Sequence, residues 1–150
     1  EALRQRHPDL PIEVVALGKS KPGELDGLPY PIHHLGLVSD PAVLVEAYAC
    51  SDVFVTPSLE ENLPNTIMES MACGTPAVGF EVGGIPEMIE HQQTGCVTPF
   101  KNSVQLADDM AWVLADEHRR QVLGQNARQK VLRDYAQGVV AQRYLKCYVS

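Results

Sequence analysis

The chain has 150 residues, enough for one domain, and its 19 Asp and Glu side chains outnumber its 12 Lys and Arg side chains, giving a net charge of −7. An acidic surface repels a polyphosphate backbone, so we expect no nucleic-acid partner. The sequence has no apolar run approaching the roughly 18 residues of a membrane-spanning helix, and it has no signal-peptide pattern. Its four cysteines are scattered without a Cys-x-x-Cys pair, which predicts neither a zinc site nor a disulfide scaffold and fits a cytoplasmic location.

Strands and helices are predicted to alternate along the first part of the chain. A strand from Pro11 to Leu17 leads into a Gly- and Pro-rich connection from Lys19 to Pro31, expected to be a loop with a short helix, and then into a strand from Ile32 to Leu35. Apolar residues at helical spacing predict a helix from Pro41 to Cys50, followed by a buried strand from Val53 to Thr56. The residues before the first strand have a helical composition but are shorter than an average helix, so we expect the sequence to begin inside an element.

The alternation continues to the end of the sequence. The further predicted elements are a helix that begins at Pro64 and ends before Gly74, a strand from Ala77 to Phe80, a short helix from Pro86 to His91, a strand from Cys96 to Thr98, a helix capped by Ser103 and ending at Leu114, and helices from Asp116 to about Arg133 and from Tyr135 to Tyr148. This order predicts an α/β fold with a Rossmann-like, doubly wound parallel sheet.

Two glutamates bracket the turn between the strand that ends at Thr56 and the helix that follows it. Pro64 fits the first helical position and disfavours helical geometry in the residue before it, so Leu63 is the expected cap. Glu61 then lies in the loop at the carboxyl end of the strand, and Glu69 lies in the second turn of the helix. In an open α/β sheet this edge holds the ligand crevice.

The start of this helix is a predicted phosphate site. Backbone amides in a first helical turn lack intrahelical partners and carry the positive end of the helix dipole, so those of Leu63, Asn65 and Thr66 can bind a diphosphate. Glu69, one turn further on, can accept hydrogen bonds from two vicinal hydroxyls, as acidic residues do from a ribose. Glu61 would face the group at the other end of the phosphates, and a sugar fits that geometry.

The residues after the glutamates extend the motif. The sequence continues with Ser70 to Val78, which contains Gly-Thr-Pro, and with Val82 to Glu87, which reads Val-Gly-Gly-Ile-Pro-Glu. This ordered run resembles the donor-binding half of retaining nucleotide-sugar glycosyltransferases of the GT-B fold, the group 1 or family 4 type. His34 to Asp40 is similar to the family's strand and loop beside the nucleotide base, and the closing helices fit the same template, so the resemblance covers nearly the whole chain.

The resemblance implies that residues 1–150 form a donor-binding domain, truncated at its N-terminal end, whose partner acceptor domain lies outside the sequence. The implied reaction, of the kind used in polysaccharide biosynthesis, transfers a sugar from a nucleotide-diphosphate sugar to an acceptor with retention, without a metal or another cofactor. The catalytic residue implied is Glu61. The donor-binding residues implied are Glu69, Asn62, Leu63, Pro64, Asn65, Thr66, Leu37, Val38, Gly83 and Gly84. Leu37 and Val38 would contact the base through backbone atoms.

The sequence departs from the family pattern in two places. Asn62-Leu63-Pro64 stands where the family often has Gly-Phe-Gly, which leaves the donated sugar undecided. The family's phosphate-binding Arg and Lys, near the start of the domain, have no counterpart in this sequence. No Asp-x-Asp or His and Cys cluster is present to hold a metal.

Several alternatives stay open at this stage. Gly83 and Gly84 either serve only as turn glycines or approach the donor. A nucleotide-sugar epimerase on the same fold, and a non-catalytic nucleotide-sugar binding domain, are the other two functions considered. Five basic residues in one predicted helix favour a solvated face over a lipid-binding one, with peripheral membrane association left open because many relatives modify membrane-held acceptors; these residues are Arg119, Arg120, Arg128, Lys130 and Arg133.

Overall fold

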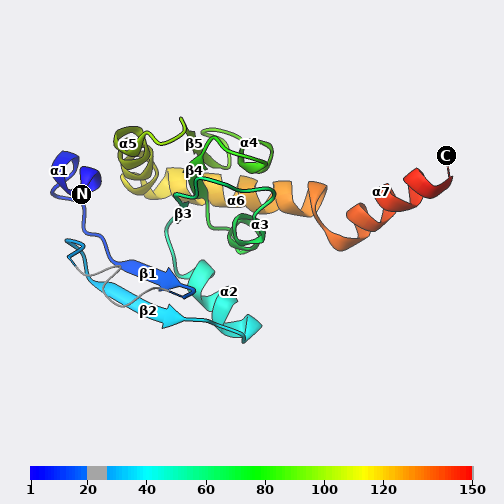
Figure 1. The fold of residues 1–150 in the computed structure, drawn as a ribbon, viewed down its shortest axis with the longest axis horizontal. Helices are drawn as coiled ribbons and strands as arrows, with labels where there is room; N and C mark the ends of the chain where they lie inside the picture. The colour runs from blue at the N-terminus through cyan, green and yellow to red at the C-terminus, as the bar shows by residue number, and fades with distance from the viewer. Residues whose placement is uncertain (20–26, 150) are drawn as a thin grey trace.

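The computed structural model describes residues 1–19 and 27–149 and confirms an α/β fold with parallel strands (Figure 1). The strands form two sheets. In one, β1 (Val14–Leu17) pairs with β2 (Ile32–Gly36), and in the other the order is β3 (Phe54–Thr56), β4 (Ala77–Phe80), β5 (Gly95–Thr98). Within the described residues β1 and β3 are not paired, so the sheet is divided where the sequence predicted one continuous sheet.

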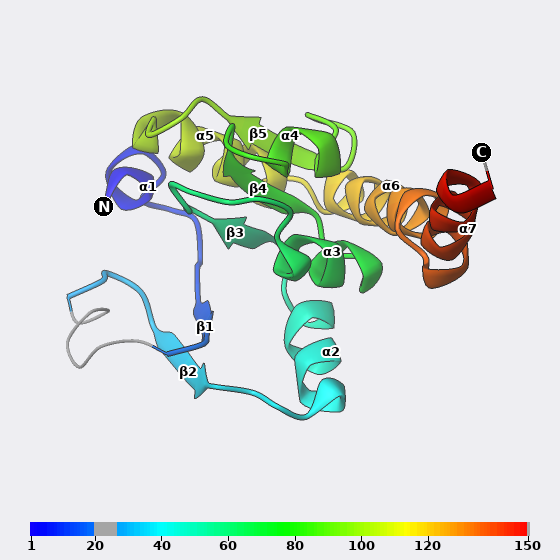
Figure 2. The ribbon, with the colours of Figure 1, turned by 45° about the vertical axis from the view of Figure 1, so that its right-hand side comes forward.

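Seven helices are described, and they follow the predicted order. They are α1 (Ala2–Arg6), α2 (Pro41–Ala49), α3 (Asn65–Ala72), α4 (Ile85–Met88), α5 (Ser103–Leu114), α6 (Glu117–Asp134) and α7 (Gln137–Val149). Figures 1 and 2 both show the β1–β2 sheet with α2 on one side of the molecule and the β3–β5 sheet with α3 to α6 on the other. Both views also show α7 reaching away from the sheets toward the C-terminus. The short helix expected between Lys19 and Pro31 falls largely on residues 20–26, which lie outside the described residues.

Side-chain caps fix where three of these helices begin. The Asp40 carboxylate accepts a hydrogen bond of 2.9 Å from the Ala42 amide at the start of α2, and Asp116 caps α6 in the same way. The predicted cap of α5, Ser103, is wrong by one residue, because the Asn102 side chain accepts from the Gln105 amide at 2.9 Å and leaves Ser103 as the first helical residue.

Two other boundaries differ from the prediction for reasons of backbone geometry. Pro64, not Leu63, is the N-cap of α3, since its φ of −69° fits a helix but its ψ of 117° is extended. A proline ring fixes φ alone, so sequence could not separate these two states. Helix α4 ends at Met88 rather than His91, because the buried Ile89 is extended and the Glu90 amide donates to Thr94 Oγ1 instead of continuing the helix.

The main core packs α3, α4 and α6 around β4. Ile67 and Met71 of α3, together with Ile85 and Met88 of α4, are fully buried, and Ala127 of α6 packs in the same cluster. Burying a side chain of the size of Ile or Met stabilises a fold by about 1.5–3 kcal/mol. Helix α3, which carries the candidate site, is therefore fixed by its packing against α4, α6 and β4.

Glycines allow α6 to approach the end of α3. Gly74 has a φ of +84° and follows the C-cap of α3, as predicted for a helix-ending glycine. A Cβ on Gly124 of α6 would lie only 2.1 Å from the Gly74 carbonyl oxygen. Any side chain at Gly124 would therefore push α6 away from α3.

Candidate functional site

The β3–α3 connection places the two glutamates as predicted. Strand β3 ends at Thr56, and α3 begins at Asn65. Glu61 is half-buried in the loop between them, and Glu69 is exposed in the second turn of α3. The neighbouring parallel strand β4 ends at Phe80, so the residues that follow it meet the same edge of the sheet.

The glycine turn after β4 contacts the Glu61 loop directly. The Gly84 amide donates a 2.6 Å hydrogen bond to the Asn62 carbonyl. A Cβ on Gly83 would lie 1.8 Å from the Glu61 carbonyl oxygen, and one on Gly84 would lie 2.4 Å from that of Asn62. Gly83 also has a φ of +53°, where other residues are strained. Both glycines therefore support the loop that carries Glu61, whichever donor contacts they make.

The N-terminus of α3 has no side-chain cap. The side chain of Pro64 has no acceptor atom for the amides of Asn65 and Thr66, and the side chains of Asn65 and Thr66 are exposed. The amides of Asn65 and Thr66 are thus available to an anion by helix geometry, whereas the Ile67 amide donates to the Pro64 carbonyl at 3.2 Å. Because the helix begins one residue later than predicted, the Leu63 amide lies outside its first turn.

Glu69 has a hydrogen-bond partner that sequence reasoning missed. The Tyr48 hydroxyl of α2 donates to Glu69 Oε2 at 3.0 Å. Burial, and then the bond to Glu69, raises the pKa of the Tyr48 phenol far above its ordinary value, so it stays a proton donor. The helical spacing of apolar residues between Pro41 and Cys50 predicts the helix that carries Tyr48 but not this contact. The available signal was that a buried tyrosine hydroxyl needs a partner.

Leu37 and Val38 lie in the loop between β2 and α2. Leu37 is 69% exposed and Val38 is half-buried. Among the described contacts, none joins them to the β3–α3 turn. Helix α2 is the element between the two regions, since it begins shortly after Val38 and ends near Tyr48, which contacts Glu69.

The thiol nearest to Glu69 is in its protonated form. Burial raises the pKa of Cys73, the nearby Arg128 opposes this effect, and the Glu69 charge adds to it. Arg128 of α6 donates to the Ala72 carbonyl at 2.5 Å, which places a cation at the C-terminal end of α3 where the helix dipole favours it. Arg128 thus stabilises the helix that carries Glu69.

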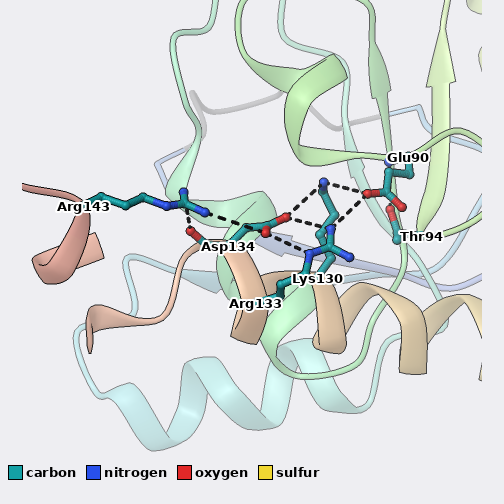
Figure 3. A network of polar contacts seen from close by, with 6 residues as sticks. All are labelled: Glu90, Thr94, Lys130, Arg133, Asp134 and Arg143. Carbon is teal, nitrogen blue, oxygen red and sulfur yellow. Dashed lines mark hydrogen bonds and ion pairs between the residues drawn. The ribbon is translucent and has the colours of Figure 1, made fainter. Parts of the chain in front are cut away.

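The five basic residues of α6 do not form one solvated face, which corrects the sequence-based interpretation. Arg119 stacks on Trp112 with its guanidinium 4.3 Å from the ring centre, and Arg120 pairs with Asp52 at 3.1 Å. Lys130 is nearly buried and contacts Glu90 at 2.9 Å and Asp134 at 3.5 Å (Figure 3).

Arg133 joins the same ion-pair network at the end of α6. It pairs with Asp134 at 2.8 Å and with Glu90 at 3.3 Å, and Arg143 of α7 donates to the Asp134 carbonyl at 3.0 Å (Figure 3). With Arg128 bonded to Ala72, each of the five basic side chains has a partner inside the domain. These residues form contacts between α6 and other parts of the domain, and they do not form a single basic face that could bind lipid.

The described residues contain neither a cluster of metal ligands nor a membrane-spanning helix. No group of three or more His, Cys, Asp or Glu residues in residues 1–19 and 27–149 is arranged to hold a metal ion. No helix in those ranges combines the length and apolar character needed to cross a membrane.

An open apolar groove of about 440 Å³ lies beside the site and is lined by Leu63, Met68, Tyr135 and Tyr144 among others. Its apolar lining does not suit a diphosphate.

The fold is a parallel α/β domain, and its sheet edge at the carboxyl ends of β3 and β4 carries the uncapped amides of α3 and two glutamates. The model of the family described as glycosyl transferases group 1 matches residues 1–116, and the chain belongs to this family.

Curated relatives agree with the family assignment. The chain is 37% identical over 117 residues to an N,N'-diacetylbacillosaminyl-diphospho-undecaprenol alpha-1,3-N-acetylgalactosaminyltransferase of Campylobacter jejuni, covering 78% of this chain and 30% of that protein. It is 32% identical over 105 residues to an N-acetyl-alpha-D-glucosaminyl L-malate synthase of Bacillus anthracis, covering 70% and 28% of the two chains. The chain therefore spans less than a third of the length of these relatives.

Solved structures confirm the fold as the C-terminal half of the GT-B type. Anabaena HepE in complex with UDP matches with a TM-score of 0.82 at 24% identity, covering 99% of this chain and 43% of that chain. The C-terminal domain of a glycosyl transferase group 1 protein, LpcC of Francisella tularensis, matches with a TM-score of 0.71 at 25% identity and covers 89% of this chain and 73% of that chain.

Proposed function

We propose that this chain binds the donor in a glycosyltransferase that moves a sugar from a nucleotide-diphosphate sugar to an acceptor with retention of configuration. The observation that carries the proposal is the edge where the Glu61 loop, braced by Gly83 and Gly84, meets the uncapped N-terminus of α3 and Glu69. HepE, which shares the fold, binds UDP in its solved complex, and this supports a nucleotide ligand.

In this proposal each of these residues contacts a different part of the donor. The Asn65 and Thr66 amides face the diphosphate, and Glu69, one turn along α3, accepts hydrogen bonds from the ribose hydroxyls. Glu61 precedes the helix start and faces the transferred sugar. Asn62, Leu63 and Pro64 shape the turn between them, and the backbone of Leu37 and Val38 lies beside the base.

Retention requires that the acceptor attack the face from which the diphosphate leaves. The bond between the anomeric carbon and the phosphate oxygen breaks, and its electron pair leaves with the diphosphate. The acceptor oxygen bonds to the anomeric carbon on the same side, and the proton of the acceptor hydroxyl passes to the departing phosphate oxygen. Positive charge develops at the anomeric carbon, so a carboxylate at Glu61, or its hydrogen bond to a sugar hydroxyl, gains strength in the transition state. In this proposal helix amides bind the phosphate charge without a metal, together with basic side chains from outside the chain.

The proposed domain organisation is a donor-binding domain joined to an acceptor domain elsewhere in the same protein. The limited share of the relatives that the chain spans supports this arrangement.

We further propose a cytoplasmic location and a role in building a polysaccharide or another glycoconjugate. The scattered cysteines support the first part. The Campylobacter jejuni relative is named for an undecaprenol-linked substrate, and an acceptor held at the cytoplasmic face of a membrane is the corresponding proposal here.

A calorimetric titration of the full-length protein against a panel of nucleoside diphosphates and nucleotide sugars tests this function. One nucleoside diphosphate and its sugar conjugates should bind, and Glu69→Gln should weaken both by roughly tenfold to a hundredfold, the cost of charge-assisted hydrogen bonds to hydroxyls. If Glu69→Gln leaves the affinity for the nucleoside diphosphate unchanged, Glu69 does not bind ribose.

A further inference from the structure

Contacts from β3 and from the loop after α3 hold Tyr48 in one position. It is 3% exposed, and its backbone carbonyl accepts a 2.6 Å hydrogen bond from the hydroxyl of Thr75, which is itself buried. The ring of Phe54 packs edge-on against the Tyr48 ring at 5.7 Å between centres and an angle of 75°. The phenol is therefore a fixed donor, set by α2, β3 and the loop after α3.

Glu69 differs from its partner in that its side chain is exposed. An exposed glutamate has three rotatable side-chain bonds, and fixing them when a ligand binds costs entropy. The Tyr48 hydroxyl holds Oε2 of Glu69 at 3.0 Å, which selects one conformation of the carboxylate before a ligand arrives. A carboxylate has about four acceptor positions, so this bond leaves acceptor capacity on both oxygens for two vicinal hydroxyls.

We propose that Tyr48 is a positioning residue for the donor, which orients the Glu69 carboxylate toward the ribose diol through its hydroxyl. The inference rests on the proposed function of Glu69. It also gives α2 a part in binding, because this helix joins the Leu37–Val38 loop to Glu69 and so couples the base side of the site to the ribose side.

Tyr48→Phe in the full-length protein isolates the hydroxyl. The ring and its contact with Phe54 are kept, and no buried carboxylate is left without a partner because Glu69 is exposed. The melting temperature should therefore stay close to that of the wild type. Tyr148→Phe is the matched control, since Tyr148 lies on α7 and is 83% exposed.

The readout is the affinity ratio between UDP and 2′-deoxy-UDP, measured by calorimetry for the wild type, Tyr48→Phe, Glu69→Gln and the double variant. We expect Tyr48→Phe to weaken UDP by roughly tenfold, the scale of one hydrogen bond to a charged group, and to weaken 2′-deoxy-UDP less. In the Glu69→Gln background, Tyr48→Phe should have little further effect, because the two residues act through one contact.

Two outcomes overturn the proposal, and they differ from failure of the function itself. If Tyr48→Phe weakens UDP and 2′-deoxy-UDP equally, or if its effect adds fully to that of Glu69→Gln, Tyr48 has only a structural role. If Glu69→Gln does not change the affinity ratio, the ribose assignment fails and the role of Tyr48 fails with it.

Discussion

The roles assigned to the two glutamates depend on which end of the donor each one faces. Glu61 is half-buried before the helix start, whereas its neighbour Glu60 is exposed. We expect Glu61→Gln in the full-length protein to lower turnover by much more than it lowers affinity for the free nucleoside diphosphate. The reason is that an interaction with charge at the anomeric carbon exists only in the transition state.

Glu60→Gln is the matched control for this measurement, because it makes the same chemical change one residue away on the exposed side. Steady-state kinetics and calorimetry of the two variants give the comparison. Equal losses of turnover in both variants would remove the sugar-facing role of Glu61. So would equal losses of turnover and diphosphate affinity in Glu61→Gln.

Residue positions along the chain were predictable where the signal was local. Pro64 and Gly74 mark the two ends of α3 in the sequence. They predict Glu61 in the loop before the helix and Glu69 in its second turn, and the structure has both residues there. The Tyr48 bond to Glu69 joins residues on different helices, so no pattern within either helix could reveal it. Pro64 was assigned to the wrong position because its φ suits both a cap and a helix.

At the scale of elements, the site depends on the contact between the turn after β4 and the loop after β3. Gly83→Ala would place a methyl group 1.8 Å from the Glu61 carbonyl oxygen and would strain a φ of +53°. We expect this variant to destabilise the domain by about 1–3 kcal/mol and to lower turnover, because the Glu61 loop must move. Thermal unfolding and steady-state kinetics measure the two effects.

Gly138→Ala provides the control for the glycine substitution. A Cβ at Gly138 meets nothing within 4 Å, and the residue lies in α7, where alanine is favoured over glycine. This variant should be neutral or slightly stabilising with unchanged turnover. A Gly83→Ala protein with wild-type stability and turnover would show that the two loops need not touch.

The ion-pair network that joins α6 to the loop after α4 predicts an acid-dependent loss of stability. The Arg133 hydrogen bond and the surrounding cations lower the pKa of Asp134 from 3.8 to about 2, and Lys130 lowers that of Glu90. A carboxylate whose pKa is lower when folded stabilises the fold above its unfolded pKa, and this contribution is lost as the pH falls toward its folded pKa. The network therefore weakens between about pH 4.5 and pH 2.

Asp134→Asn tests this assignment. We expect it to destabilise the protein by on the order of 1 kcal/mol at pH 7 and to lose its effect near pH 2, where the wild-type carboxylate also becomes protonated. Unfolding curves across this pH range, with the exposed Asp9→Asn as control, provide the measurement. A difference that stayed constant over the whole range would assign the effect of Asp134 to something other than its charge.

Element types were largely predictable, and the pairing between elements was not. Most strands and helices have their own apolar pattern and a Gly, Pro, Asn or Asp at a boundary, so their order follows from the sequence. Whether β1 pairs with β3 depends on what lies between them, and no residue in either strand encodes that. The same reason applies to the contacts of Arg119 with Trp112, of Arg120 with Asp52 and of Lys130 with Glu90, since each joins α6 to a residue outside that helix.

At the scale of the whole molecule, we propose a phosphate site that works without a metal. In this proposal its charge partners are the α3 amides and basic side chains from elsewhere in the full-length protein. We expect EDTA to leave the affinity of the full-length protein for its nucleoside diphosphate within about twofold. Calorimetry with EDTA and with added Mg²⁺ measures this affinity. Loss of binding in EDTA would contradict a phosphate site that works without a metal.

The most direct test of the central claim follows the anomeric proton of the donor by NMR while the full-length protein acts on its nucleotide sugar and an acceptor. The account predicts a new glycoside with the anomeric configuration of the donor, together with release of the nucleoside diphosphate. Three results would contradict it: a product of inverted configuration, an epimerised nucleotide sugar, or a donor that binds and stays unchanged with every acceptor supplied.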